Sequence, residues 1–161
     1  MPLTPRVSRP NMAGYGLLPE NEGSGLRPWS YAVERLERAR NFWISTTRAD
    51  GRPHSAPIWA LWWQERLLFS TGEQSRKAKN LGALPYAVIG CEPADDAIVL
   101  EGPVERVRDA DLLREFARAY GAKYAEDMEG FSQPVYALRP KLAFAFASTD
   151  FVGSATRWTF D

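Results

Sequence analysis

The sequence has very little of two residue types on which whole classes of protein depend. Its 161 residues include one cysteine, Cys91, and one histidine, His54. A single cysteine excludes an internal disulfide, and a lone thiol is typical of a packed residue in a reducing compartment. One cysteine and one histidine also provide no ligand spacing that is typical of zinc sites. We therefore expect a cytoplasmic protein without a bound metal.

Two further absences concern the partners of the chain. Lysine and arginine total 20, as do aspartate and glutamate, so the formal net charge is zero. A neutral chain lacks the broad positive field that attracts nucleic acid. No hydrophobic run is long enough to span a bilayer, and the first residues are polar and proline-rich, unlike a secretory leader. We expect neither nucleic-acid binding nor a membrane span.

The chain divides into an irregular start and one domain. Residues 1–28 are rich in proline and glycine and follow no stable period, so we interpret them as an N-terminal arm that docks on a surface. Residues 29–161 have the length and composition of a single globular domain.

Strand patterns dominate this domain. Tight or short links join consecutive strands, which makes them antiparallel, and the helices are too few to cover two faces of a sheet. The pattern therefore predicts a mainly β fold with flanking helices, closed or half-closed into a barrel. The predicted strands are 41–47, 53–63, 67–71, 86–92, 97–107 and one or two within 135–148, with a tail at 155–160. The predicted helices are 29–40, capped by Ser30, 75–84, capped by Ser75, and 109–128, capped by Asp109 or Asp111.

The strand at 53–63 carries three tryptophans. Alternation places Trp59 and Trp63 on one face and Trp62 on the other, so at least one set is expected to pack while the other meets a ligand or a second subunit. Pro57 removes a backbone donor, which predicts an edge or a local opening in the sheet. His54, at the start of this strand, is either a surface residue or a neighbour of a bound ring.

An unusual helix start follows the strand at 67–71. The segment LLFSTGEQSRKAKNL places Arg76, Lys77 and Lys79 in the first turn after Ser75, where the helix dipole is positive and acidic residues are normally favoured. One interpretation is an anion site, in which free N–H groups and these cations converge on a phosphate or carboxylate. The other is a solvated turn partly neutralised by Glu73. These residues alone leave both open.

The same region carries a family resemblance. The hairpin DGRPHSAPIWALWWQERLLFSTGEQSRKAKNL, followed by YAVIGCE and AIVLEGPVERV, resembles the pyridoxamine 5'-phosphate oxidase-like superfamily of flavin-binding split β-barrels over about residues 40–147. The segments RPNMAGYG and ATRWTF are similar to the actinobacterial flavin and deazaflavin oxidoreductases within it. The resemblance implies an antiparallel split β-barrel that forms a homodimer.

The resemblance also implies a cofactor site. The vitamin B6 oxidases have Arg, Lys and Gln where this chain has Ala56, Leu61 and Ala97, so the expected cofactor is the 8-hydroxy-5-deazaflavin coenzyme (factor 420), with FMN as the alternative. The implied ligands are Ala56, Pro57, Ile58 and Trp59 along the ring, Ser70, Thr71, Ser75, Arg76 and Lys77 around the phosphate, and Trp158 near the cofactor of either subunit.

The implied activity is an oxidoreductase that transfers hydride between this cofactor and a small organic acceptor. No Ser-His-Asp set and no carboxylate pair is visible, and none is needed when a cofactor carries the reaction. We therefore expect no catalytic side chain. The alternative is a protein of the same fold that binds a flavin, deazaflavin or tetrapyrrole without turnover.

Overall fold

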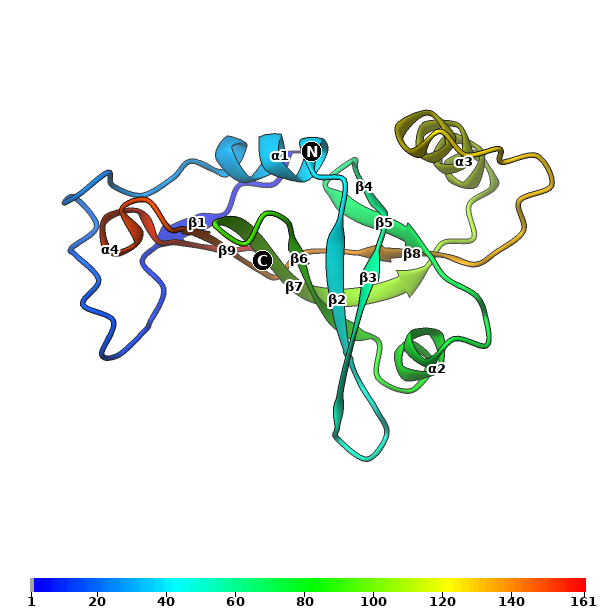
Figure 1. Cartoon of the computed structure of the whole chain (residues 1–161), viewed down its shortest axis with the longest axis horizontal. Helices are drawn as coiled ribbons and strands as arrows, with labels where there is room; N and C mark the ends of the chain where they lie inside the picture. The colour runs from blue at the N-terminus through cyan, green and yellow to red at the C-terminus, as the bar shows by residue number, and fades with distance from the viewer. Residues whose placement is uncertain (1) are drawn as a thin grey trace.

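The computed structural model describes residues 2–161, which form ten strands and four helices (Figure 1). The strands are β1 (Arg6–Ser8), β2 (Phe42–Thr47), β3 (Pro53–Ile58), β4 (Ala60–Trp63), β5 (Arg66–Ser70), β6 (Tyr86–Cys91), β7 (Asp96–Arg106), β8 (Val135–Leu138), β9 (Leu142–Ala147) and β10 (Thr156–Thr159). The helices are α1 (Trp29–Arg38), α2 (Arg76–Ala83), α3 (Ala110–Tyr124) and α4 (Phe151–Ser154). Among these residues no helix is both long and apolar enough to cross a membrane.

Two antiparallel sheets share the long strand β7. Its first part pairs with β6 and β9 in a sheet ordered β1-β10-β9-β7-β6-β2-β3, and its last part pairs with β8, which continues to β5 and β4. The change of sheet occurs around Gly102 and Pro103. A side chain at Gly102 would overlap the carbonyl oxygen of Arg139, so only glycine allows the two segments to cross this closely. The mainly β, split-barrel prediction is confirmed.

The strand predicted at 53–63 is in fact two strands in different sheets. β3 pairs with β2 at the edge of the first sheet, and β4 pairs with β5 in the second. Trp59 lies at the break between them. The prediction of one continuous strand was therefore wrong, whereas the edge position predicted from Pro57 is confirmed.

The core consists of two clusters that divide the tryptophans as alternation predicts. Trp62 is 8% exposed and belongs to the main cluster, where it packs edge-on against Trp29 of α1. Trp59 and Trp63 pack against the second cluster, which lies under α3 and includes Phe116. One set of tryptophans thus packs between α1 and the sheets, and the other supports α3.

Two of the three predicted helix caps are present. Ser75 accepts a hydrogen bond from Ala78 N at the start of α2, and Asp109 accepts one from Leu112 N at the start of α3. The Ser30 cap was wrong: the N-cap position of α1 is Pro28, two residues earlier, with no side-chain cap, and Ser30 lies within the helix. Pro28 fixes the extended backbone that precedes the helix without any help from a hydroxyl.

Within the predicted arm, residues 2–28 dock on their own chain rather than remaining irregular throughout. Its strand β1, which the sequence did not predict, pairs antiparallel with β10. Arg9 follows this strand, and its guanidinium holds the arm to the segment around α4. The acceptors of Arg9 are the carbonyl oxygens of Leu18, Pro19, Glu22, Gly153 and Ala155, at 2.9–3.2 Å.

Candidate functional site

A pocket of about 330 Å³ opens beside the break between β3 and β4. Segments distant in the sequence meet here: the end of β3, the end of β5, the first turn of α2 and the last part of α3. Its lining residues are Asn41, Pro57, Ile58, Trp59, Ser70, Lys77 and Tyr120. The pocket is therefore built from the points where two strands end and one helix begins.

The last turn of α3 holds the broken strand in place. The hydroxyl of Tyr124 accepts a hydrogen bond from Ala60 N at 3.0 Å and donates to the carbonyl oxygen of Arg40 at 2.7 Å. Lys123 Nζ donates to the carbonyl oxygen of Ala60 at 2.9 Å. A backbone that leaves one sheet for another exposes polar groups, and burial without partners would be costly. These two side chains satisfy the groups of Ala60.

Burial changes the ionisation of both supporting side chains. The pKa of Lys123 is lowered to about 8, chiefly because the ammonium is desolvated and then because Arg40 is nearby. The pKa of Tyr124 is raised to about 12, first by burial. Tyr124 therefore stays a neutral donor at physiological pH, whereas Lys123 titrates close to it.

Trp59 forms one wall of the pocket and is held by aromatic contacts. Its ring stacks on Tyr124, with centroids 4.5 Å apart and an interplanar angle of 7°. Tyr120, the next lining residue on α3, lies 6.3 Å from the Trp59 ring, and the Arg40 guanidinium lies 5.3 Å from it. The indole is fixed in orientation, so the pocket wall is preformed.

The hydroxyls at the start of α2 are already engaged. Ser75 caps the helix and shares a hydrogen bond of 2.9 Å with Thr71, which is buried. Ser70 donates to the carbonyl oxygen of Pro134 at 2.8 Å. Of the predicted hydroxyl donors, Ser70 lines the pocket but its proton has a protein acceptor. The donors left for a ligand are the first-turn backbone N–H groups and the cationic side chains.

Those cations have no counter-charge among residues 2–161. Arg76, Lys77 and Lys79 form no salt bridge, and the first turn of α2 contains no acidic residue. Glu73, the neighbouring carboxylate of the second interpretation, is paired instead with Arg106 at 3.0 Å. This observation disfavours the solvated, Glu73-neutralised turn and fits the requirements of a bound phosphate.

The structure brings together half of the ten ligands expected from the resemblance. Pro57, Ile58, Trp59, Ser70 and Lys77 line the pocket. The others lie around it or away from it: Ala56 is half-buried in β3 opposite Ile44, Thr71 and Ser75 form the hydrogen-bonded base of α2, and Arg76 is exposed on its first turn.

Trp158 lies outside the pocket. It is 0% exposed, packs on Trp29 at 5.3 Å, and donates from Nε1 to the carbonyl oxygen of Arg27 at 3.2 Å. A side chain so enclosed within its own chain has no surface for a cofactor. The expectation that Trp158 is a ligand is corrected here to a core residue beneath α1.

Four residues of the site were not expected from the sequence. Asn41 and Tyr120 line the pocket, while Lys123 and Tyr124 support its backbone. The helical spacing that includes Phe116 and Tyr120 was visible in the sequence, but it indicates only a packed face. The sequence around this helix does not indicate that the end of its packed face contacts the break between β3 and β4.

His54 lies in β3, three residues before Pro57, the first residue of this strand that lines the pocket. It is half-buried opposite Thr46, whose hydroxyl accepts a hydrogen bond of 3.0 Å from Asn80 of α2. Its Nδ1 is buried and has no hydrogen-bond partner among the described residues. In the same part of the chain no group of three or more potential metal ligands occurs.

Two sheets that share one strand, with a pocket against the free edge of the first sheet, define a split-barrel protein. Residues 31–152 match the sequence profile of the family described as pyridoxamine 5'-phosphate oxidase, and the chain belongs to that family.

Comparisons with individual proteins agree with this assignment. The chain is 33% identical over 97 residues to a pyridoxine/pyridoxamine 5'-phosphate oxidase of Myxococcus xanthus, which covers 57% of this chain and 47% of that enzyme. The chain thus matches about half the length of this curated relative.

Solved structures show the same fold at low sequence identity. An F420 reductase is similar with a TM-score of 0.57 and 23% identity, over 68% of this chain and 93% of that one. An FMN-binding protein related to pyridoxamine 5'-phosphate oxidase, from Nostoc punctiforme, is similar with a TM-score of 0.54 and 18% identity, over 78% and 86%.

Proposed function

We propose that this protein is an oxidoreductase that binds a phosphate-bearing deazaflavin, with FMN as the alternative, in the pocket between β3, β5 and α2. The observation that supports it most directly is the start of α2, where three cations have no acidic partner among the described residues. A helix N-terminus attracts anions through its free N–H groups and its dipole. The F420 reductase and the FMN-binding protein of similar fold make both cofactors reasonable.

The residues present fit such a cofactor at both of its ends. Lys77 lines the pocket and, with the backbone N–H groups of the first turn of α2, would bind the phosphate. β3 pairs only with β2, so its free edge offers backbone N–H and C=O groups to the rim of a planar ring. Pro57 and Trp59 would limit where that ring lies.

The proposed reaction is hydride transfer to or from a small organic acceptor, and the bound cofactor supplies that chemistry. The side chains that line the pocket would bind and orient the cofactor and exclude water from it. Burial raises the pKa of Tyr120, the lining residue on α3, so its hydroxyl stays protonated and available as a hydrogen-bond donor.

We also propose that a second copy of the chain covers the outer face of the first sheet. Trp43 in β2 is 49% exposed on this face. Strand register places one row of side chains across all seven strands: Pro57, Trp43, Gly90, Val99, Phe144, Arg157 and Ser8. Because this row ends at Pro57 of the pocket, a partner seated there would also close the cofactor site.

The central test is a spectroscopic titration of the purified protein with each cofactor. Replacing Lys77 by Ala is expected to weaken binding by about ten-fold, as for a lost charge-assisted hydrogen bond, and more strongly at low salt. Arg114→Ala removes an exposed cation from α3 and serves as the matched control. If neither cofactor binds, the proposal fails.

The same preparation separates the two functional alternatives. Sustained oxidation of the reduced cofactor by quinones or unsaturated carbonyls is expected of an oxidoreductase. Tight binding without turnover would instead support a carrier of a flavin, deazaflavin or tetrapyrrole.

The dimer is tested by light scattering. The unmodified chain is expected at twice its monomer mass, and Trp43→Arg is expected to release monomers and weaken cofactor binding together. Arg114→Glu, at an exposed residue of α3, which packs on the other core cluster, is the control. A monomeric wild-type protein that binds cofactor would contradict the dimer but leave the cofactor site intact.

A further inference from the structure

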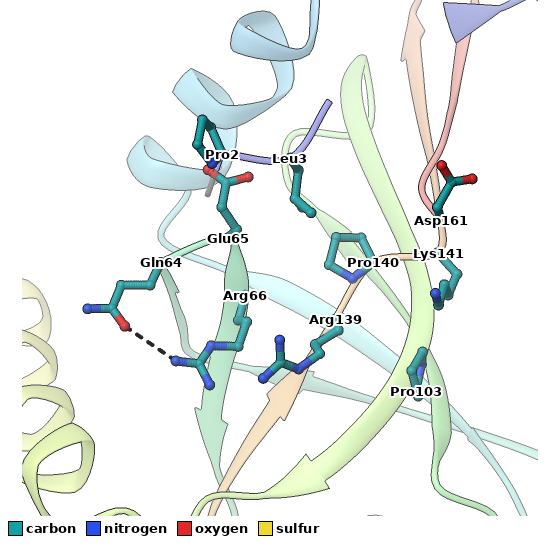
Figure 2. A pocket seen from close by; sticks show the side chains of 10 residues that line it. All are labelled: Pro2, Leu3, Gln64, Glu65, Arg66, Pro103, Arg139, Pro140, Lys141 and Asp161. Carbon is teal, nitrogen blue, oxygen red and sulfur yellow. Dashed lines mark hydrogen bonds between the residues drawn. The ribbon is translucent and has the colours of Figure 1, made fainter. Parts of the chain in front are cut away.

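A second and larger cavity lies at the end of the second sheet where β5 begins and β8 ends. It has a volume of about 730 Å³ and is bounded by the β4–β5 turn, the link between β8 and β9, and the two ends of the described chain (Figure 2). It shares no lining residue with the pocket at α2. Its volume lies within the range of small-molecule sites.

Two arginines lie side by side on one wall of this cavity. Leu67 of β5 is opposite Leu138 of β8; Arg66 begins β5 and Arg139 directly follows β8, so the two arginines lie at the same end of these antiparallel strands. Figure 2 shows both side chains directed into the same part of the cavity. Like charges directly opposite each other on neighbouring strands destabilise a sheet unless an anion lies between them.

The existing partners of these cations leave much of their hydrogen-bonding capacity free. Arg66 donates to the neutral amide of Gln64 at 3.3 Å, and Arg139 pairs with Glu105 at 3.2 Å through a contact that is more than half exposed on both sides. Lys141 forms no salt bridge within residues 2–161, not even with Asp161, which lines the same cavity. Exposed pairs of this kind contribute little.

An acidic group lies on the other side of the cavity. Glu65 occupies a tight turn in which both it and Gln64 have a left-handed backbone, with φ of 62° and 49°, which is uncommon for residues other than glycine. Its Oε2 is buried and accepts no hydrogen bond from any described residue. Figure 2 shows the Glu65 carboxylate beside Pro2 and apart from the arginine pair, and the apolar side chains of Leu3 and Pro140 line the cavity to one side of them.

We propose that this cavity binds a small zwitterion, with a phosphate or carboxylate on Arg66 and Arg139 and an ammonium group on Glu65. The anion would relieve the repulsion between the two guanidiniums, and the ammonium would give the buried carboxylate oxygen its missing donor. The apolar wall formed by Leu3 and Pro140 fits a spacer of a few carbon atoms. This site is independent of the cofactor pocket.

The probe is phosphoethanolamine, measured by isothermal titration calorimetry. The titrations use protein that carries Lys77→Ala, so that phosphate binding at α2 is weakened from the start. Saturable binding is expected at millimolar concentrations or below, and Arg66→Gln and Arg139→Gln are each expected to weaken it by about ten-fold, as for a lost charged hydrogen bond. Arg114→Gln, an exposed arginine on α3, should have no effect.

Glu65→Gln separates a zwitterion site from a simple anion site. This variant is expected to bind phosphoethanolamine more weakly and inorganic phosphate with unchanged affinity, because only phosphoethanolamine carries an ammonium group. γ-Aminobutyrate has a carboxylate in place of the phosphate, with the same three-atom spacing from the ammonium group, and so distinguishes the two kinds of anion. The proposal is overturned if phosphoethanolamine shows no saturable binding, if the arginine variants bind it as well as their parent does, or if Glu65→Gln affects both ligands alike.

Discussion

The starts of α2 and α3 answer the same physical requirement in opposite ways. α3 is capped by Asp109, carries Asp111 in its first turn and has Lys123 in its last, as the helix dipole favours. α2 is capped by Ser75 but follows it with Arg76 and Lys77 and has no acidic residue in that turn. Both helices begin correctly, yet only α3 begins in the way that is best for its own stability.

The difference between the two helix starts corresponds to the different surroundings of the two helices. α3 covers the second core cluster and supports Ala60, which are structural tasks. α2 directs its first turn toward the pocket at the edge of the first sheet. A helix that gives up dipole stabilisation beside a pocket is the arrangement expected of an anion-binding site.

Making α2 resemble α3 should have the largest effect. In the double variant Arg76→Glu and Lys77→Glu, the first turn becomes acidic, so cofactor affinity should fall by more than about 100-fold as two charged contacts turn repulsive. The same change should raise the melting temperature of the free protein, because the dipole is now complemented. Titration and thermal unfolding of one preparation measure both. Loss of stability together with loss of binding would contradict the comparison.

Removing the cap of α3 should have a smaller and purely structural effect. Asp109→Ala is expected to lower the free energy of unfolding by about 1 kcal/mol, the usual cost of a lost N-cap. Cofactor affinity should not change, because this end of α3 does not line the pocket. Denaturant unfolding measures the change in stability, and cofactor titration measures the affinity. A change in affinity would mean that the two helix starts are coupled.

A third expected effect is a pH dependence of stability at the far end of α3. Folding lowers the pKa of Lys123 from 10.5 to about 8, so between these values the folded protein has released a proton that the unfolded chain still holds. The contribution of Lys123 to stability should therefore rise with pH through this window. Urea unfolding of the wild type and of Lys123→Met should be compared at pH values across this window. As pH rises, the free energy of unfolding of the wild type should increase relative to that of the variant. A constant difference would exclude this titration.

Sequence reasoning succeeded where the deciding interactions are local. The caps at Ser75 and Asp109 involve residues three positions apart, and the edge placement of β3 follows from the missing donor of Pro57. The strong amphipathic and alternating patterns likewise located most of the strands and three of the helices.

It failed where distant segments decide. The break at Trp59 depends on Tyr124, 65 positions along the chain, satisfying the backbone of Ala60. Five of the seven residues that line the pocket were expected from the resemblance. Trp158 was misplaced because a short aromatic motif does not tell whether its ring faces a ligand or the core. Tyr120 was missed because its helical spacing has the same form whether it packs or lines a pocket.

The attachment of the arm by Arg9 has a mechanical consequence. β1 and β10 are antiparallel, and Arg6 is opposite Thr159, so the segments before β1 and after β10 leave this strand pair at the same end. A force applied between those ends would peel this strand pair apart one hydrogen bond at a time. The guanidinium of Arg9 comes next and contacts five carbonyl oxygens at once, so it would bear the load as a unit. In a single-molecule pulling experiment, one side chain should therefore set the first resisting step.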